Sequence, residues 1–212
     1  MGIMLARDEI LGVILAGGGA RRMFAECAGD KGLIDLAGKP MLAHVIERLA
    51  PQVGAIVLNA NGDPDRLQAF GLDIIPDLDD SRAGPLAGFA AAMAWAAQHR
   101  PHTQAIVTVP ADLPFVPTNL VETFLTIAGG GVAIAVSDGQ RHPTVGLWPL
   151  SLRCTLVAAL SDGQRRVENF AQRHQAIAVS FPFSNIGGRT VDPFFNANTP
   201  EDMAAARALL TG

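Results

Sequence analysis

The stretch ILGVILAGGGARRM, from Ile10 to Met23, decides the fold of this chain. An unbroken apolar run that ends in glycines predicts a strand buried on both faces, as strands of parallel sheets are. The glycines let a ligand approach the backbone closely, and Arg21, Arg22 and Lys31 follow in the same loop. Amides and three cations suit a nucleoside triphosphate. Taken alone, the stretch fits a plain glycine-rich turn with a solvated arginine pair equally well.

Composition limits the class of protein. The chain has 212 residues, is 49% hydrophobic and carries a formal net charge of -4, which argues against disorder and against wholesale capture of nucleic acid. No apolar run reaches the roughly 18 residues of a membrane helix, so we expect a cytoplasmic protein. Cys27 and Cys154 are far apart in the sequence, which argues against a structural zinc site.

Strand and helix patterns alternate up to Ile127, which predicts a doubly wound α/β domain with a mostly parallel sheet. After Gly131, two strands joined by a turn at Asp138–Gly139 predict an antiparallel excursion in the C-terminal half. We expect a single domain over residues 6–212. The predicted helices cover residues 40–51, 64–70, 84–100, 118–128, 150–160, 166–174 and 199–210. The predicted strands cover residues 10–16, 54–61, 72–77, 105–112 and 176–182.

The glycine-rich loop matches neither of two common phosphate-binding motifs. Gly17 and Gly19 fit the dinucleotide fingerprint, but Arg22 takes the place of the third glycine. The sequence GDKG lacks both the spacing and the hydroxyl of a Walker A loop. A nicotinamide-dependent dehydrogenase is further disfavoured because Asn59 and Asn61, and no acidic residue, end the second strand.

Polar residues stand where the predicted parallel strands end, the edge at which open α/β sheets bind ligands. These residues are Asn59, Asp77 and Asp112. Asp112 is placed to hold Mg²⁺, which prefers one or two carboxylates together with substrate phosphates. A helix N-cap is the alternative role for Asp112, and Asn198 likewise could simply cap the last helix.

Eight motifs in order resemble those of the molybdenum cofactor guanylyltransferases, from about Gly12 to Leu209. They are LAGGGARRM, DKGL, LAGKPML, AGPLAG, PADLPF, RHPTVGLWP, GQRRVENF and NANTPEDM. The resemblance implies a Rossmann-like three-layer domain of the nucleotidyltransferase group. In one departure from the family pattern, Phe24 replaces a glycine and the loop is about three residues longer, which costs little entropy.

The resemblance implies transfer of GMP from GTP to the terminal phosphate of molybdopterin, with release of pyrophosphate. It places GTP on the N-terminal half and molybdopterin on the C-terminal half. The implied catalytic residues are Arg22, Lys31 and Asp112, with Asp112 as the Mg²⁺ ligand. The implied nucleotide-binding residues are Leu15, Ala16, Gly17, Lys31, Asn59, Asp77 and Asp112.

The molybdopterin side is assigned to five residues, His142, Arg165, Arg166, Asn196 and Asn198. The asparagines follow from the resemblance, His142 from its place at the expected rim, and the arginines from their charge. A solvated pair is an equal alternative for the arginines. A structural or surface role is the main alternative for His142.

We expect GTP and molybdopterin as substrates, transient contacts with other molybdenum cofactor biosynthesis or acceptor proteins, and a monomer that contacts neither nucleic acid nor membrane. A cytidylyltransferase acting on the same pterin, or a sugar-phosphate nucleotidyltransferase, is the nearest alternative function. A nucleotide-binding regulator without catalytic activity is the alternative from another class.

Overall fold

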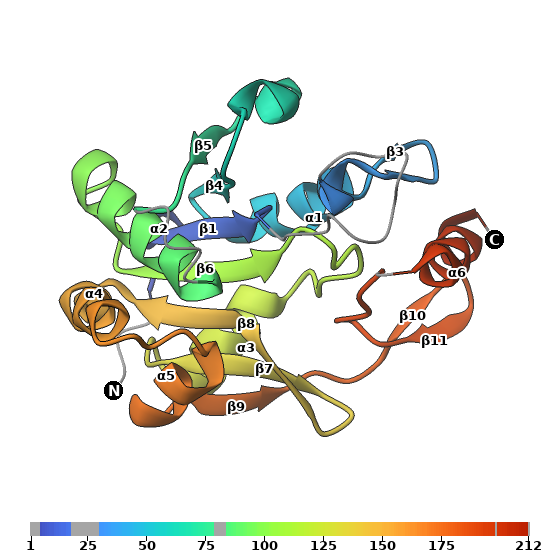
Figure 1. Cartoon of the computed structure of the whole chain (residues 1–212). Coiled ribbons are helices and arrows are strands. Elements are labelled where there is room, and N and C mark those ends of the chain that lie inside the picture. The colour runs from blue at the N-terminus through green and yellow to red at the C-terminus, as the bar shows by residue number, and fades with distance from the viewer. Residues whose placement is uncertain (1–4, 18–29, 79–83, 198, 212) are drawn as a thin grey trace.

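The computed structural model describes residues 5–17, 30–78, 84–197 and 199–211 of the chain. Within these residues, a sheet of seven strands forms the centre of the molecule, in the order β5-β4-β1-β6-β8-β7-β9 (Figure 1). β8 runs antiparallel to its neighbours β6 and β7, whereas the other neighbouring strands are parallel. The strands are β1 (Ile10–Leu15), β4 (Ala55–Asn59), β5 (Asp73–Ile75), β6 (Ala105–Pro110), β7 (Ala133–Ser137), β8 (Gln140–Pro149) and β9 (Ile177–Ser180). The predicted mostly parallel sheet with an antiparallel excursion is confirmed.

Helices cover both faces of this sheet and give the expected three layers (Figure 1). α1 and α3 pack on one face, and α2, α4 and α5 pack on the other. α6 lies beyond the carboxyl ends of the parallel strands. The α-helices are α1 (Met41–Leu49), α2 (Pro85–His99), α3 (Leu120–Ala128), α4 (Arg153–Ser161), α5 (Val167–Arg173) and α6 (Pro200–Thr211). Short 3-10 helices are η1 (Arg7–Glu9), η2 (Lys31–Leu33), η3 (Ala50–Gln52), η4 (Pro64–Phe70) and η5 (Leu150–Leu152).

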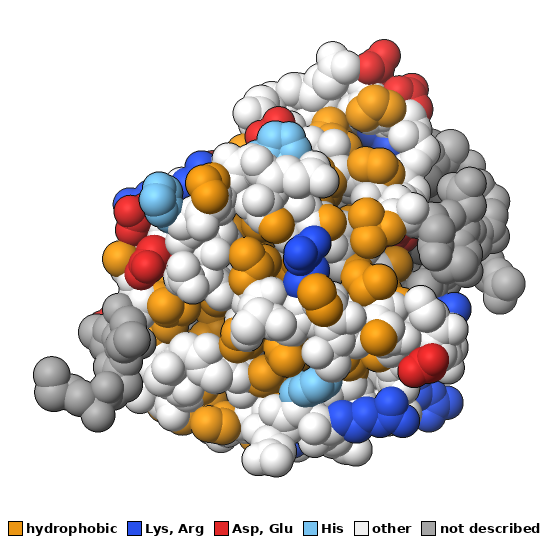
Figure 2. Space-filling view, turned by 90° about the vertical axis from the view of Figure 1, so that its left-hand side faces the viewer, with side chains coloured by type: hydrophobic (Ala, Val, Ile, Leu, Met, Phe, Trp, Pro, Cys, Tyr) orange, Lys and Arg blue, Asp and Glu red, His pale blue; other side chains and the backbone are white. Residues whose placement is uncertain are grey.

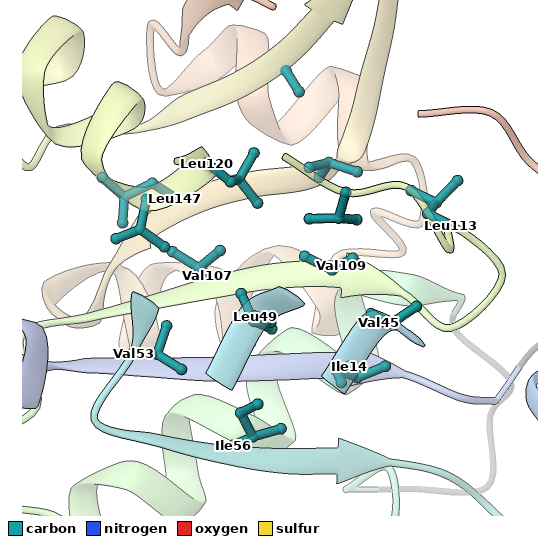
Figure 3. Packing of buried hydrophobic residues seen from close by; sticks show 14 of the residues in the cluster. Ile14, Val45, Leu49, Val53, Ile56, Val107, Val109, Leu113, Leu120 and Leu147 are labelled. Atoms are coloured by element: carbon teal, nitrogen blue, oxygen red, sulfur yellow. The ribbon is translucent and has the colours of Figure 1, made fainter. Parts of the chain in front are cut away.

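β1 is buried on both faces, as its apolar run predicts. Ile14 belongs to the same hydrophobic cluster as Val45 and Leu49 of α1 (Figure 3), whereas Val13 belongs to the cluster beneath α2. Gly12 faces α1, where an added Cβ would come within 3.1 Å of Leu49 Cδ2. The glycine therefore lets α1 pack closely on the strand that leads into the site.

Three local features differ from or refine the sequence prediction. The segment Pro64–Phe70 is a helix, as predicted, and it is of the 3-10 type. Two short hairpins were not predicted, one made of β2 (Asp35–Leu36) and β3 (Lys39–Pro40), the other of β10 (Ser184–Ile186) and β11 (Arg189–Val191). Their strands are two or three residues long, too short for a recognisable period of two.

The last helix begins as the sequence predicts. The N–H of Asp202 donates to Oγ1 of Thr199 at 3.0 Å, and the N–H of Thr199 donates to the Asp202 carboxylate at 2.8 Å. This reciprocal pair satisfies two backbone donors at the helix N-terminus.

α6 packs on the β2–β3 hairpin through a small hydrophobic cluster that is separate from the two clusters on the faces of the central sheet. In addition, Nη2 of Arg207 donates to the carbonyl of Asp35 at 2.8 Å. The C-terminal helix therefore supports the segment that directly follows η2. The buried residues of the cluster are Leu36, Met41, Phe115, Val191, Ala197, Met203 and Ala206.

The amino ends of the parallel strands lie at the edge of the molecule opposite to their carboxyl ends and to α6. Figure 2 shows this side, on which hydrophobic side chains are scattered between polar groups and basic side chains stand in separate groups. None of the helices that the structure describes has the length and apolar character needed to cross a bilayer.

Candidate active site

The carboxyl ends of four parallel strands meet at one edge of the sheet. Leu15 at the end of β1 is paired with Asn59 at the end of β4 and with Pro110 at the end of β6. Asn59 is in turn paired with Ile75 at the end of β5. The chain continues beyond β1 along the same line, because the N–H of Ala16 donates to the carbonyl of Asn59 at 2.8 Å. The predicted strand-end residues therefore share the edge at which such sheets bind ligands.

Asn59, Asn61 and Asp77 form an acid–amide cluster at this edge. Nδ2 of Asn59 donates to Oδ1 of Asp77 at 3.0 Å, and Nδ2 of Asn61 donates to Oδ2 at 2.7 Å. The backbone N–H of Asp77 donates back to Oδ1 of Asn61 at 2.9 Å. Both carboxylate oxygens of Asp77 are thus held in a defined orientation. Gly17 lies beside this cluster, since a Cβ added to it would be 3.8 Å from the carbonyl oxygen of Asn59.

The side chain of Asn59 is buried against Gly88 of α2. A Cβ added at position 88 would lie 2.1 Å from Oδ1 and 2.7 Å from Cγ of Asn59. The amide also donates to the carbonyl of Ile75 at 3.2 Å, so it has little freedom to move aside. The acid–amide cluster therefore requires glycine at position 88.

Gly88→Ala is expected to displace the Asn59 amide and break its hydrogen bonds to Asp77 and Ile75. We expect a loss of about 1–3 kcal/mol in the free energy of unfolding, because buried polar groups lose their partners. Urea unfolding followed by circular dichroism measures this loss. The matched control is Asn59→Ala combined with Gly88→Ala, which removes the clash and should be as stable as Asn59→Ala alone. Additive losses in the double variant would contradict the proposed clash.

Lys31 and Asp112 come together from distant parts of the chain. Nζ of Lys31 lies 3.8 Å from Oδ2 of Asp112, and the two side chains are only 22% and 19% exposed. Burial is the largest influence on Asp112 and raises the pKa of its carboxyl group. The charge of Lys31, the backbone N–H of Asp112 and the side chain of Asn196 lower that pKa in part. The site therefore holds a carboxylate whose negative charge is incompletely compensated.

Local packing brings Lys31 to this position. Asp30 caps η2, since its Oδ1 accepts the N–H of Gly32 at 3.2 Å. A Cβ on Gly32 would lie 3.3 Å from the Cβ atoms of Ala111 and Leu42. Gly32 therefore lets the turn that carries Lys31 lie closely against the residue before Asp112.

The donor set fits a hard divalent cation held jointly with a substrate. Asp112 offers one partly buried carboxylate just beyond the end of β6. Among the described residues, no group of three or more His, Cys, Asp and Glu side chains gathers into a complete metal cage. Magnesium is commonly bound through one or two carboxylates and the phosphates of its nucleotide. Asp112 is suited to that arrangement.

His142 lies at the same edge of the sheet, near the start of β8. Its Nε2 is 2.8 Å from Oγ of Ser137, and its ring centroid is 4.8 Å from that of Phe194. Burial lowers the pKa of His142, and the charge of Asp192 raises it to a smaller extent. The imidazole is therefore held in place by an aromatic ring and a hydroxyl, and its neutral form is favoured.

The remaining molybdopterin-side candidates lie on two segments. Asn196 is adjacent to Asp112, whose carbonyl accepts the N–H of Ala197 at 3.3 Å. Arg165 is exposed and donates through Nη1 to the carbonyl of Leu160 at 2.7 Å. Arg166 precedes α5. The structure thus brings Asn196 to Asp112 and places the two arginines on the α4–α5 connection. Arg22 and Asn198 lie outside the described residues.

Sequence reasoning missed three residues of this edge, namely Asp30, Arg66 and Gly88. Asp30 directly precedes Lys31 and opens the motif DKGL, but the sequence assigned it no role of its own. Gly88 is the last residue of the motif AGPLAG, which was its one signal, whereas Arg66 lies on η4 and does not differ in pattern from an ordinary surface arginine. Their partners become visible only in three dimensions.

Comparison with known proteins identifies the family of this chain. The family model described as "MobA-like NTP transferase domain" matches residues 12–177. The chain is 48% identical to a molybdenum cofactor guanylyltransferase of Bradyrhizobium sp. (strain ORS 278), over 93% of this chain and 92% of the relative. It is 44% identical to one of Rhodopseudomonas palustris (strain BisB5), over 93% and 92%.

A solved structure shares the fold. It is molybdopterin-guanine dinucleotide biosynthesis protein A from Archaeoglobus fulgidus, with a TM-score of 0.65 and 24% identity over 93% of this chain and 97% of that one. The family inferred from the sequence motifs is confirmed by the relatives. The chain belongs to the MobA-like NTP transferases, the family of the molybdenum cofactor guanylyltransferases.

Proposed function

We propose that this protein transfers GMP from GTP to the terminal phosphate of molybdopterin, releasing pyrophosphate and forming molybdopterin guanine dinucleotide. The family and the names of the relatives support guanylyl transfer over cytidylyl or sugar-phosphate nucleotidyl transfer. The observation that carries the proposal is the pairing of Lys31 with Asp112 beside the acid–amide cluster, at one edge of the sheet.

The reaction needs positioning and charge neutralisation more than acid–base chemistry. An oxygen of the molybdopterin phosphate attacks the α-phosphorus of GTP in line, and the bond from that phosphorus to the pyrophosphate oxygen breaks. Because the attacking phosphate is already anionic, no general base is required. The ammonium group of Lys31, together with Arg22 of the glycine-rich loop, balances the charge that grows on the departing β- and γ-phosphates.

The nucleoside lies at the acid–amide cluster in this proposal. Leu15, Ala16 and Gly17 offer backbone groups to guanine and ribose. Asn59 holds Asp77, whose oriented carboxylate has lone pairs left for N–H groups of the base. Guanine presents such donors on its edge, so Asp77 supports its recognition.

A divalent cation, for which we propose Mg²⁺, fits at Asp112. When bound, it would neutralise phosphate charge and help to fix the geometry of the triphosphate. Asp112 is oriented for this role by the loop that contains Asn196 and Ala197.

Molybdopterin lies on the C-terminal half of the single domain, residues 6–212, in this proposal. Asn196 links the two halves because it neighbours Asp112. His142, with its neutral ring against Phe194, offers an apolar face and a ring nitrogen to a pterin. Arg165, Arg166 and Asn198 complete the proposed side, with the arginines attracting the anionic pterin phosphate. We propose further that the protein acts as a cytoplasmic monomer with transient contacts to other cofactor biosynthesis or acceptor proteins, without nucleic acid or membrane.

A nucleotide screen by thermal unfolding tests the proposal. A ligand that binds only the folded state at 100 times its Kd stabilises it by about 2.7 kcal/mol. For a domain of this size that corresponds to a rise in Tm of about 5–10 °C. We expect this rise for GTP with Mg²⁺, and smaller rises for CTP, for ATP and for GTP without metal. A larger rise with CTP would favour the cytidylyltransferase alternative. Release of pyrophosphate that depends on molybdopterin would exclude a regulator without catalytic activity.

A further inference from the structure

Asp30 is a largely buried carboxylate immediately before Lys31. Its side chain is only 6% exposed. Oδ1 accepts the N–H of Gly32, while Oδ2 lies 3.4 Å from Nε of Arg66, a residue 36 positions away. Burial raises the pKa of Asp30, and the Gly32 N–H and the Arg66 guanidinium lower it in part. A carboxylate in such a position needs its partners to remain charged and in place.

Arg66 makes contacts through all three nitrogens of its guanidinium group. Nε faces Asp30, Nη2 donates to the carbonyl of Asn61 at 2.9 Å, and Nη1 donates to the carbonyl of Asp63. A planar, forked donor can hold a carboxylate and two carbonyls at once, whereas a lysine ammonium cannot reproduce this geometry. Arg66 therefore connects the turn after β4 to the residue that precedes Lys31.

These contacts join the two ends of the proposed GTP site into one path. At the nucleobase end, Asn61 holds the Asp77 carboxylate. From Asn61 the path runs through Arg66 to Asp30, and Asp30 caps the short helix whose first residue is Lys31. η2 has only three residues, so the cap that Asp30 supplies acts directly on the turn that carries the lysine.

We infer that Arg66, acting through Asp30, is a positioning residue that sets the distance between Lys31 and the nucleoside end of the site. This inference rests on the proposed function, because it assigns Lys31 to the triphosphate. Arg66 sets where the lysine charge stands relative to the β- and γ-phosphates, without itself contacting the reacting atoms. A purely structural ion pair would instead affect stability and the binding of all nucleotides alike.

A double-mutant cycle between Arg66 and Lys31 tests the inference. The proteins are the wild type, Arg66→Ala, Lys31→Ala and the double variant, each titrated calorimetrically with GTP and with GMP. Residues coupled through a shared network show non-additive effects. We expect Arg66→Ala to weaken GTP about fivefold to tenfold and GMP less than about twofold. In the Lys31→Ala background, Arg66→Ala should weaken GTP less than about twofold further.

Two further variants protect the test against a simple loss of folding. Asp30→Asn keeps an oxygen for the Gly32 N–H but removes the charge that attracts Arg66, and it should show the same selective loss of GTP. Arg7 is the matched control, since its guanidinium also donates to two backbone carbonyls, those of Val53 and Ala50, next to the amino end of β1. Arg7→Ala should leave the ratio of GTP to GMP affinity unchanged, even where it lowers the Tm.

The outcomes separate this inference from the function on which it rests. Three results would overturn the positioning role while leaving guanylyl transfer intact. They are losses of GTP affinity that multiply in the double variant, an equal loss of affinity for GTP and GMP in Arg66→Ala, and wild-type GTP affinity in Arg66→Ala. A wild-type protein that fails to bind GTP in the same titration would overturn the proposed function and this inference with it.

Discussion

Asp112→Asn is expected to reduce the rate of GMP transfer by about a hundredfold to a thousandfold. This is the usual effect of removing one group that stabilises charge in a transition state. The substitution keeps the shape and hydrogen-bonding capacity of the side chain near Asn196 but removes the charge that the proposed cation needs. Steady-state release of pyrophosphate in the presence of GTP, Mg²⁺ and molybdopterin measures the effect. Near-wild-type turnover would contradict the metal assignment.

The same variant should not lose stability in the absence of nucleotide and metal. Burial raises the pKa of Asp112 above its ordinary value of 3.8, which means that folding disfavours the ionised carboxylate at neutral pH. A neutral asparagine removes this penalty, so its free energy of unfolding should equal or exceed that of the wild type. As the pH falls through the raised pKa towards 3.8, the wild-type carboxyl group becomes neutral as well, and the difference between the two proteins should shrink.

A matched substitution separates this effect from a general loss of negative charge. Asp73→Asn removes an exposed carboxylate at the start of β5, at the amino end of that strand. We expect Asp73→Asn to leave turnover unchanged. A comparable loss of turnover in both variants would point to overall charge and away from a specific role of Asp112.

Lys31→Ala is expected to weaken GTP about tenfold to a hundredfold, which corresponds to the loss of one hydrogen bond to a charged group. GMP lacks the β- and γ-phosphates, so its affinity should change less than about twofold. Isothermal titration of both nucleotides measures the ratio directly. An equal loss for the two nucleotides would contradict the assignment of Lys31 to the leaving pyrophosphate.

Lys39→Ala is the matched control for this prediction. Nζ of Lys39 lies 2.6 Å from Oε1 of Glu47, but both side chains are exposed and the pair is a surface ion pair, a type that contributes little. We expect its loss to change neither the affinity for GTP nor that for GMP. The contrast between the two lysines isolates the effect of location from that of charge.

The parallel half of the fold could be predicted because its signals are long and local. The apolar runs at Ile10–Leu15 and Ala105–Pro110 and the amphipathic segment at Met41–Leu49 each carry enough residues to define their period. The β10–β11 hairpin lacks such a signal because its strands have three residues each. The type of helix at Pro64–Phe70 depends on hydrogen-bond geometry, which a hydrophobic pattern does not encode.

The candidate site also has a part that could be predicted from the sequence and a part that could not. Asn59, Asp77 and Asp112 were identified because a rule of the fold places strand ends together, and the structure does bring Asn59 into contact with Asp77 and Lys31 close to Asp112. Arg66 could not be identified, because its role depends on a partner 36 residues away and on the path of the backbone between them. The roles proposed for Lys31, Asp112 and Arg66 in binding and catalysis remain predictions that the variants above test.

The packing of α6 on the β2–β3 hairpin has a consequence for synthesis on the ribosome. Lys31 and the hairpin leave the ribosome well before Met203 and Ala206, which complete the hydrophobic cluster around Leu36. The central sheet can assemble before that moment, but the cluster that supports the hairpin cannot. The edge of the sheet at which we propose phosphate binding therefore gains its full support only after α6 has been synthesised, which delays its maturation relative to the central sheet.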